Sequence, residues 1–228
     1  MKAKGRPLIV GLLMLAVLAF AGCASNGSVN VSSNAIESEG HTSITQSEAT
    51  LADPSADEQR ATADRSYLGK VLIAYFSIEG HTKEIAEEIH AQIGGDLFEI
   101  VPREPYTGTR NDLSGIASTE LRESARPSVA SHVNDMAQYD TVFIGYPCWW
   151  GNAPMVVFTF LEEYDFSGKV VAPFSSYGTS GWGSSLESIQ EAIGSGADLV
   201  EGFCVQEDNM QNLSSQVASW LQELERAQ

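Results

Sequence analysis

Residues 70–82, KVLIAYFSIEGHT, contain the segment that decides the fold. The near-continuous apolar run from Lys70 to Phe76 is typical of a β-strand covered on both faces, as strands of parallel sheets are. A short loop with hydroxyl groups and a glycine leads from this strand to a helix pattern, in which Ile85, Ile89 and Ile93 recur four apart. The order of strand, loop and helix indicates an α/β protein.

The rest of 67–228 repeats this alternation of strand and helix patterns. Further strands are predicted at 96–101, 141–146, 169–175 and 198–205, and further helices at 113–121, 155–161, 186–193 and 213–224. We expect Ser184 and Glu187 to form a capping box, and the last strand to run without an insertion. Five strands alternating with helices predict a parallel sheet with helices on both faces and right-handed crossovers.

The loops after the first, third and fourth strands are the expected binding site, because ligands of such sheets lie beyond the carboxyl ends of the strands. In the first loop, the amides of residues 78–82 and the hydroxyls of Ser77 and Thr82 are suited to hold a phosphate at a helix N-terminus. The alternative is a plain turn that Thr82 caps.

The second loop, 147–154, contains adjacent tryptophans. Trp149 and Trp150 cannot both point into the core from an extended segment, so at least one indole is expected at the rim of the site. There it would suit a flat aromatic ligand, with Gly151 allowing close approach of the backbone. The alternative is an indole folded over the core.

The third loop, 175–183, offers Tyr177 and Trp182 among three glycines as an opposite wall. The alternative is a flexible connection with Trp182 packed on the next helix. The connection between the second and third strands, 102–140, is long enough to supply further walls.

Composition and motifs exclude several classes. With 13 Lys plus Arg against 30 Asp plus Glu, a net charge of −17 excludes nucleic acid as a partner. Three cysteines exclude a disulfide scaffold. Neither a GxxxxGK[ST] nor a GxGxxG phosphate motif follows the first strand, and no histidine follows Ser180 to complete a hydrolase triad. No metal site is predicted, because the acidic residues near His81 fit a solvated helix face.

The N-terminal 66 residues are expected to be a targeting signal followed by a tether. Residues 1–22 combine three basic residues, a short apolar run and small residues, which is typical of a secretory signal. The segment ends at Cys23 and resembles a bacterial lipobox, which implies acylation of Cys23 and an exported, cell-membrane lipoprotein facing the extracytoplasmic side. The alternative is an uncleaved anchor. Residues 23–66 are polar and without periodicity, so we expect a disordered tether, and only the lipid would hold so acidic a protein to a membrane.

Three segments together carry a family resemblance: YFSIEGHT at 75–82, GYPCWWGNAP at 145–154 and PFSSYGTSGWGSSLESI at 173–189. In this order and spacing, 67–228 resembles the flavodoxin family, most closely its flavodoxin-like oxidoreductase branch of the short-chain type. The resemblance implies a doubly wound five-stranded sheet of order 2-1-3-4-5 that binds FMN. The residues it implies at the cofactor are Ser77, Glu79, Gly80, His81, Thr82, Pro147, Cys148, Trp149, Trp150, Gly151, Asn152, Ser176, Tyr177, Gly178 and Gly181.

Two residues depart from the family pattern. Glu79 occupies a phosphate-loop position where the family usually has a small hydroxyl or amide residue, and its carboxylate would repel a phosphate unless it turns to water. His81 stands where Asn is common, and a protonated His81 would offset the charge of Glu79.

The predicted function is that of an FMN-binding electron-transfer protein or flavin oxidoreductase, passing electrons to a redox partner protein or a small-molecule acceptor. One alternative is an FMN-dependent NAD(P)H:quinone-type reductase. Another is a flavin-free binding module in which Glu79 marks a degenerate phosphate loop. No catalytic side chain is predicted, because the cofactor supplies the chemistry.

Overall fold

A computed structural model describes residues 66–227 of the chain. The predicted signal peptide, Cys23 and all of the predicted tether except Ser66 lie outside the described residues. The elements, in chain order, are η1 (Ser66–Leu68), β1 (Val71–Tyr75), α2 (His81–Ile93), β2 (Asp96–Glu99), α3 (Arg110–Glu123), η2 (Met136–Gln138), β3 (Thr141–Pro147), α4 (Met155–Glu162), β4 (Val170–Tyr177), α5 (Ser185–Ile193), β5 (Asp198–Leu199), β6 (Phe203–Gln206), η3 (Glu207–Asn212) and α6 (Leu213–Ala227).

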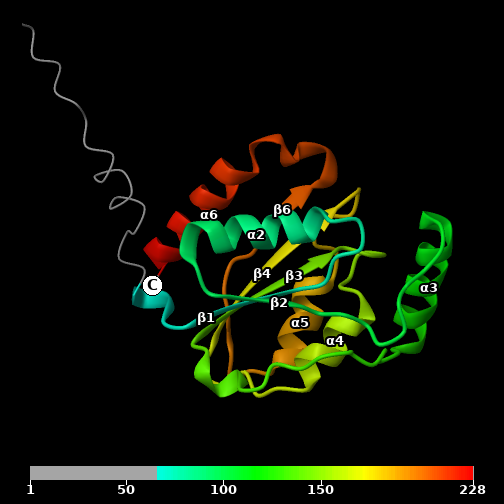
Figure 1. Cartoon of the computed structure of the whole chain (residues 1–228), viewed down its shortest axis with the longest axis horizontal. Helices are drawn as coiled ribbons and strands as arrows, with labels where there is room; N and C mark the ends of the chain where they lie inside the picture. The colour runs from blue at the N-terminus through cyan, green and yellow to red at the C-terminus, as the bar shows by residue number, and fades with distance from the viewer. Residues whose placement is uncertain (1–65, 228) are drawn as a thin grey trace, which may run out of the picture. The chain divides into compact units, whose positions relative to one another are not determined.

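The strands form one parallel sheet of order β2-β1-β3-β4-β5, with β6 also pairing with β4 (Figure 1). This confirms the predicted order. All five residues of β1 are buried, as the apolar run at 70–76 predicts for a strand covered on both faces. The chain goes from β1 outward to β2 and then back past β1 to β3, so the direction of winding changes between β1 and β3.

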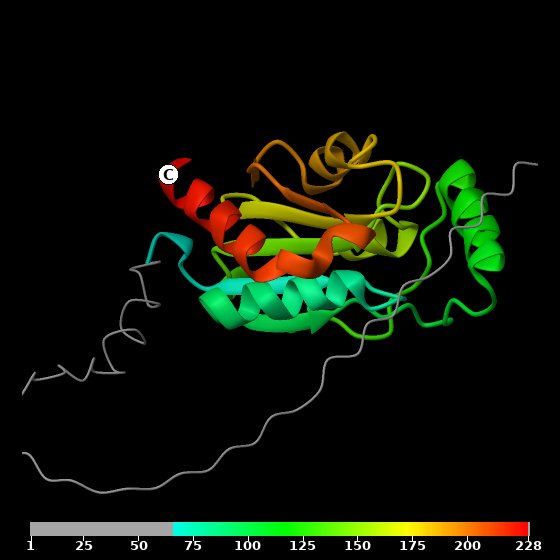
Figure 2. The same ribbon diagram turned by 90° about the horizontal axis from the view of Figure 1, so that it is seen from above.

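Helices cover both faces of the sheet. The core on one face packs Val71, Ile73 and Phe143 against α2 and α6, and the core on the other face packs Leu72 and Val142 against α4 and α5. Figures 1 and 2 show α3 apart from these two layers, beyond the carboxyl ends of the strands. Within 66–227, no helix is both long and apolar enough to cross a membrane.

The last strand differs from its prediction. It is divided into β5 and β6 by residues 200–202, and both parts pair with β4. Val171 of β4 pairs with Leu199 of β5, and Phe174 of β4 pairs with Phe203 of β6. Between these two pairs β4 advances three positions, whereas the edge strand formed by β5 and β6 advances four. The extra residue is a bulge beside Pro173, which has no N–H to offer.

The predicted capping box of α5 is also wrong. Ser184 precedes the helix, but its side chain caps no helix N–H. Its backbone N–H and its hydroxyl instead donate to the carbonyl of Gly151, at 2.7 and 3.2 Å. Ser184 therefore ties the third loop to the second.

Candidate functional site

A cavity of about 350 Å³ lies at the carboxyl ends of β1, β3 and β4. Its lining comes from the loops after these strands, from α3 and from η3: Ser77, Ile78, Glu79, His81, Thr82, Arg110, Leu113, Ser114, Ala117, Pro147, Cys148, Trp149, Trp150, Ser176, Gly178, Thr179, Ser180 and Glu207. This is the point where the winding changes direction between β1 and β3, which is where open α/β sheets bind ligands.

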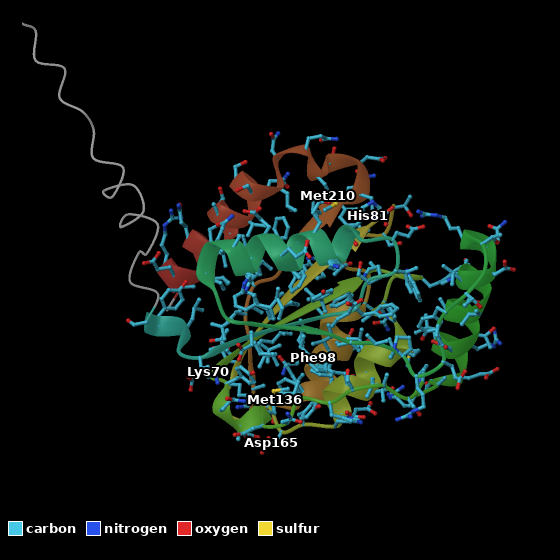
Figure 3. The ribbon with its side chains drawn as sticks, in the orientation of Figure 1. Lys70, His81, Phe98, Met136, Asp165 and Met210 are labelled. Carbon is cyan, nitrogen blue, oxygen red and sulfur yellow. The ribbon has the colours of Figure 1, made fainter. Side chains whose placement is uncertain are left out.

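The β1–α2 loop presents backbone donors. Gly80 has a left-handed conformation, with φ of 96°, and it is the N-cap of α2 without any side-chain cap, so the alternative that Thr82 caps the helix is wrong. The N–H groups of His81, Thr82 and Lys83 begin the helix and find no protein acceptor within 66–227. Figure 3 shows His81 at this end of α2, with Lys70 at the opposite end of the sheet. An anion is the natural partner of such donors.

Two buried hydroxyls stand behind these amides. Thr82 Oγ1 and Ser176 Oγ are 2.9 Å apart, and each residue is only 1% exposed. They come from α2 and β4, and both line the cavity. The hydroxyls add neutral donors and acceptors to the floor at this end.

The loop after β3 is a tight two-residue turn. Trp149 and Asn152 exchange both backbone hydrogen bonds, at 2.8 and 3.0 Å, and the central residues Trp150 and Gly151 have positive φ of 53° and 73°. Positive φ at both central residues is the pattern of a type I′ turn, in which Gly is favoured and a non-Gly residue is strained.

The turn sends the two indoles to different environments, as predicted. Trp149 is half-buried, and its ring packs edge-on against two others, with ring centroids 5.5 Å apart for Phe76 and 5.6 Å apart for Tyr106. Trp150 is 63% exposed, and its Nε1–H donates to the carbonyl of Ser114 in α3 at 3.0 Å. Both indoles line the cavity, so its apolar end has one fixed ring and one rim ring.

The loop after β4 packs against this turn, and its aromatic residues form no opposite wall. Neither Tyr177 nor Trp182 lines the cavity. The ring of Trp182 packs on that of Tyr146, with ring centroids 6.3 Å apart. The Tyr146 hydroxyl donates to Ser185 Oγ, which donates to the Trp182 carbonyl, and this chain of hydrogen bonds holds Trp182 in place. Burial raises the pKa of Tyr146, which keeps its hydroxyl neutral.

Helix α3 supplies a wall that the sequence motifs did not indicate. Leu113, Ser114 and Ala117 line the cavity, and the helix is held by the Trp150–Ser114 bond and by Tyr106, whose hydroxyl donates to Glu120 at 2.8 Å. Desolvation raises the pKa of Glu120, while the bond from Tyr106 opposes that shift. The expectation that 102–140 supplies further walls is confirmed.

Four charged or titratable groups meet at the phosphate-loop end of the cavity. Arg110 Nη2 lies 2.5 Å from Glu79 Oε2, Arg110 Nη1 lies 3.9 Å from Glu207 Oε2, and His81 Nδ1 lies 3.8 Å from Glu207 Oε1. The partner of Glu79 is thus Arg110, and His81 pairs with Glu207 instead. Glu79, His81 and Glu207 offer ligand atoms within 4.8 Å of one another, but Arg110 already brings a positive charge to them.

Neither thiol near the site is activated. Burial raises the pKa of Cys148, partly offset by a hydrogen bond from the Gly151 N–H, and burial raises the pKa of Cys204 to about 12. Because the thiolate is the nucleophile, both groups are less reactive than a free cysteine at neutral pH.

The structure places most of the predicted binding residues on the cavity. Five lie beside it without lining it: Gly80, Gly151, Asn152, Tyr177 and Gly181. Asn152 has a structural role, because its amide donates to Ser188 and its carbonyl oxygen accepts from the Ala153 N–H. The lining residues outside the cofactor set that the resemblance implies are Ile78, Arg110, Leu113, Ser114, Ala117, Thr179, Ser180 and Glu207. Of these, only Glu207 lies outside the segments 78–82, 102–140 and 175–183, which were expected to contribute to the site.

Comparison with solved structures places this fold among flavoproteins. A provisionally assigned flavoprotein from Bacteroides eggerthii DSM 20697 is 34% identical, with a TM-score of 0.60, over 67% of this chain and 96% of that one. A similarly assigned protein from Bacteroides uniformis ATCC 8492 is 32% identical, with a TM-score of 0.60, over 68% and 98% of the two chains. A flavoprotein from Lactobacillus acidophilus NCFM, solved in complex with FMN, shares the fold at 24% identity and a TM-score of 0.52, over 64% and 98%.

Sequence comparison also gives a curated relative and a family. An NAD(P)H dehydrogenase (quinone) from Acidovorax ebreus (strain TPSY) is 30% identical over 121 residues, which are 49% of this chain and 58% of that protein. The chain therefore spans little more than half the length of this relative. The family model described as flavodoxin matches residues 70–224, from before β1 into α6. The chain belongs to the flavodoxin family.

Proposed function

We propose that this protein binds FMN in the cavity at the carboxyl ends of the strands and serves as an electron-transfer protein or flavin oxidoreductase. The observation that carries the proposal is that one cavity combines N–H groups at the start of α2, which have no acceptor within 66–227, with an aromatic end formed by Trp149 and Trp150. A mononucleotide with a planar ring needs both features, and about 350 Å³ falls within the usual range for small-molecule sites.

The residues present fit the two ends of FMN. The N–H groups of His81, Thr82 and Lys83 and the Thr82 hydroxyl would hold the phosphate, and the two indoles would hold the ring. The charge of Glu79 is partly compensated, because its carboxylate is paired with Arg110. That pairing is our reason to rank the flavin-free binding module below an FMN protein. The FMN held by the Lactobacillus acidophilus neighbour supports the same assignment.

When bound, FMN supplies the transfer of electrons, and the protein's part is to bind, orient and shield it. Helix α3 lies against the cavity through Leu113 and Ala117 and excludes water from that side. Residues 67–228 carry 8 basic and 23 acidic side chains. Such a surface attracts a basic redox partner. We expect transfer rates to cytochrome c, a basic protein, to fall as salt rises, and salt-independent rates would count against a protein partner.

A second candidate function is NAD(P)H-dependent reduction of quinones or similar small acceptors. The 30% identical relative named NAD(P)H dehydrogenase (quinone) favours it, as does the wall that α3 adds to the cavity. Oxidation of NADH or NADPH by the FMN-loaded full chain with a soluble quinone separates the two candidates. A carrier leaves the nicotinamide unchanged in this assay, whereas a reductase consumes it with multiple turnovers.

We also propose that the chain belongs to the short-chain, oxidoreductase-like branch of the family. The support is that only residues 200–202 interrupt the last strand, which leaves no room for a large insertion there.

The proposed location is the extracytoplasmic side of a bacterial cell membrane, with a lipid on Cys23 as the anchor. The support is the order of basic, apolar and small residues before Cys23. Expressed in bacteria with labelled palmitate, the full chain is expected to incorporate label and to fractionate with membranes. Cys23→Ala should abolish both, while the control Cys204→Ala should change neither. Label that persists in Cys23→Ala would refute acylation at this residue.

A further inference from the structure

Among the residues that the structure describes, Arg110 is the one permanent cation on the cavity. Residues 66–227 contain eight Lys and Arg side chains, and of these Arg110 alone lines it. It is the first residue of α3, where Thr109 and Asp112 form a reciprocal capping box that fixes the start of the helix. The helix start thus determines where the Arg110 side chain begins, and α3 brings it to the β1–α2 loop.

The guanidinium lies between two carboxylates from distant parts of the chain. One is Glu79 in the β1–α2 loop, at 2.5 Å, and the other is Glu207 at the start of η3, at 3.9 Å. Each carboxylate takes a different terminal nitrogen, so the two contacts orient the planar fork. The Arg110 side chain is nevertheless 71% exposed, which leaves donors free at the rim.

Besides Arg110, the described residues at this end of the cavity offer neutral groups, carboxylates and one imidazole. The α2 amides and the hydroxyls of Thr82 and Ser176 are neutral, and the imidazole belongs to His81. Amides and hydroxyls bind a phosphate, but they also bind water or a neutral hydroxyl ligand. The amides at the start of α2 already favour an anion. A full positive charge adds to that preference for a phosphate dianion over an uncharged group, and a guanidinium matches phosphate with two parallel bonds.

We propose that Arg110 is a phosphate-selecting residue of this cavity and increases its preference for the phosphorylated flavin FMN over unphosphorylated riboflavin. The inference rests on the proposed function. Glu79 and Glu207 are positioning residues that hold the guanidinium at the rim in the free protein. On binding, Arg110 exchanges its contact with Glu79 for one with the phosphate, so Glu79 lowers FMN affinity by competing for the same donors.

The test is fluorescence titration of the purified full chain with FMN and, separately, with riboflavin at low ionic strength. Arg110→Gln is expected to weaken FMN binding about tenfold, while riboflavin affinity changes by less than about twofold. Glu79→Gln is expected to tighten FMN binding by about three- to tenfold without affecting riboflavin. Added salt should narrow the preference for FMN in the wild-type chain and have little effect on it in Arg110→Gln.

The matched control is Arg122→Gln on the same helix, because Arg122 is 65% exposed, pairs with Glu123 and lies off the cavity. It should leave both affinities unchanged. The inference is overturned if Arg110→Gln loses affinity for FMN and riboflavin equally, or loses affinity for neither. Weaker FMN binding in Glu79→Gln would overturn it as well. Each of these results leaves the proposed function standing. A wild-type chain that binds neither flavin overturns both. Circular dichroism of each variant confirms that the fold is retained.

Discussion

Replacing Gly183 with alanine is expected to produce the largest loss of both stability and FMN binding. A Cβ at Gly183 would lie 2.1 Å from the carbonyl oxygen of Gly151, and φ at this position is +55°. The two site-forming loops meet here, so they must separate to admit a methyl group. Overpacking costs about 1–3 kcal/mol, and the left-handed conformation adds about 1 kcal/mol for a residue with a Cβ. FMN affinity should fall at least about tenfold, because the cavity spans both loops.

Gly181→Ala is the matched control for this variant. Gly181 lies two residues earlier in the same loop with φ of +56°, but a Cβ there meets nothing within 4 Å. It carries the conformational cost alone, about 1 kcal/mol, and should keep FMN affinity nearly unchanged. Thermal unfolding and FMN titration of the two variants measure the difference. Equal effects would show that the close approach of Gly183 to Gly151 has no special role.

The second large effect is expected at Trp149. Trp149→Ala removes a ring that packs edge-on against Phe76 and Tyr106, and the half-buried indole should cost about 2–3 kcal/mol of unfolding free energy. It should also weaken FMN binding by about five- to a hundredfold, the range found when an aromatic platform for a nucleobase is removed. Urea unfolding and FMN titration measure the two quantities.

Trp150→Ala separates these two roles. Trp150 is 63% exposed, and within residues 66–227 its side chain makes one polar contact, to the Ser114 carbonyl in α3. Its replacement should change the unfolding free energy by less than about 1 kcal/mol and act mainly on FMN affinity. If Trp150→Ala destabilises the fold as much as Trp149→Ala, the division between a core-facing and a rim-facing indole is wrong.

Local patterns were enough to predict the sheet and two of the site loops. A strand buried on both faces must be apolar throughout, so the apolar run at 70–76 predicts β1 without further context. The adjacent tryptophans predict an indole at the rim of the site for a similar reason, because neighbouring side chains of an extended segment point in opposite directions.

The features that the sequence did not predict depend on contacts between distant segments. Arg110 reaches Glu79 across 31 positions and Glu207 across a longer interval, and no motif surrounds it. Ser184 has the pattern of a capping residue, but the Gly151 carbonyl competes successfully for its donors. One residue in the sequence could have indicated the bulge between β5 and β6, namely Pro173, because a proline inside a central strand such as β4 cannot donate to the neighbouring strand.

The most direct test of the account is a titration of the purified full chain with FMN, followed by quenching of flavin fluorescence. We predict a single site per chain with a dissociation constant at or below about 1 µM, because amide donors, Arg110 and two indoles act together on one ligand. Absence of quenching at micromolar protein and flavin, with the fold intact by circular dichroism, would contradict the assignment of this cavity to FMN.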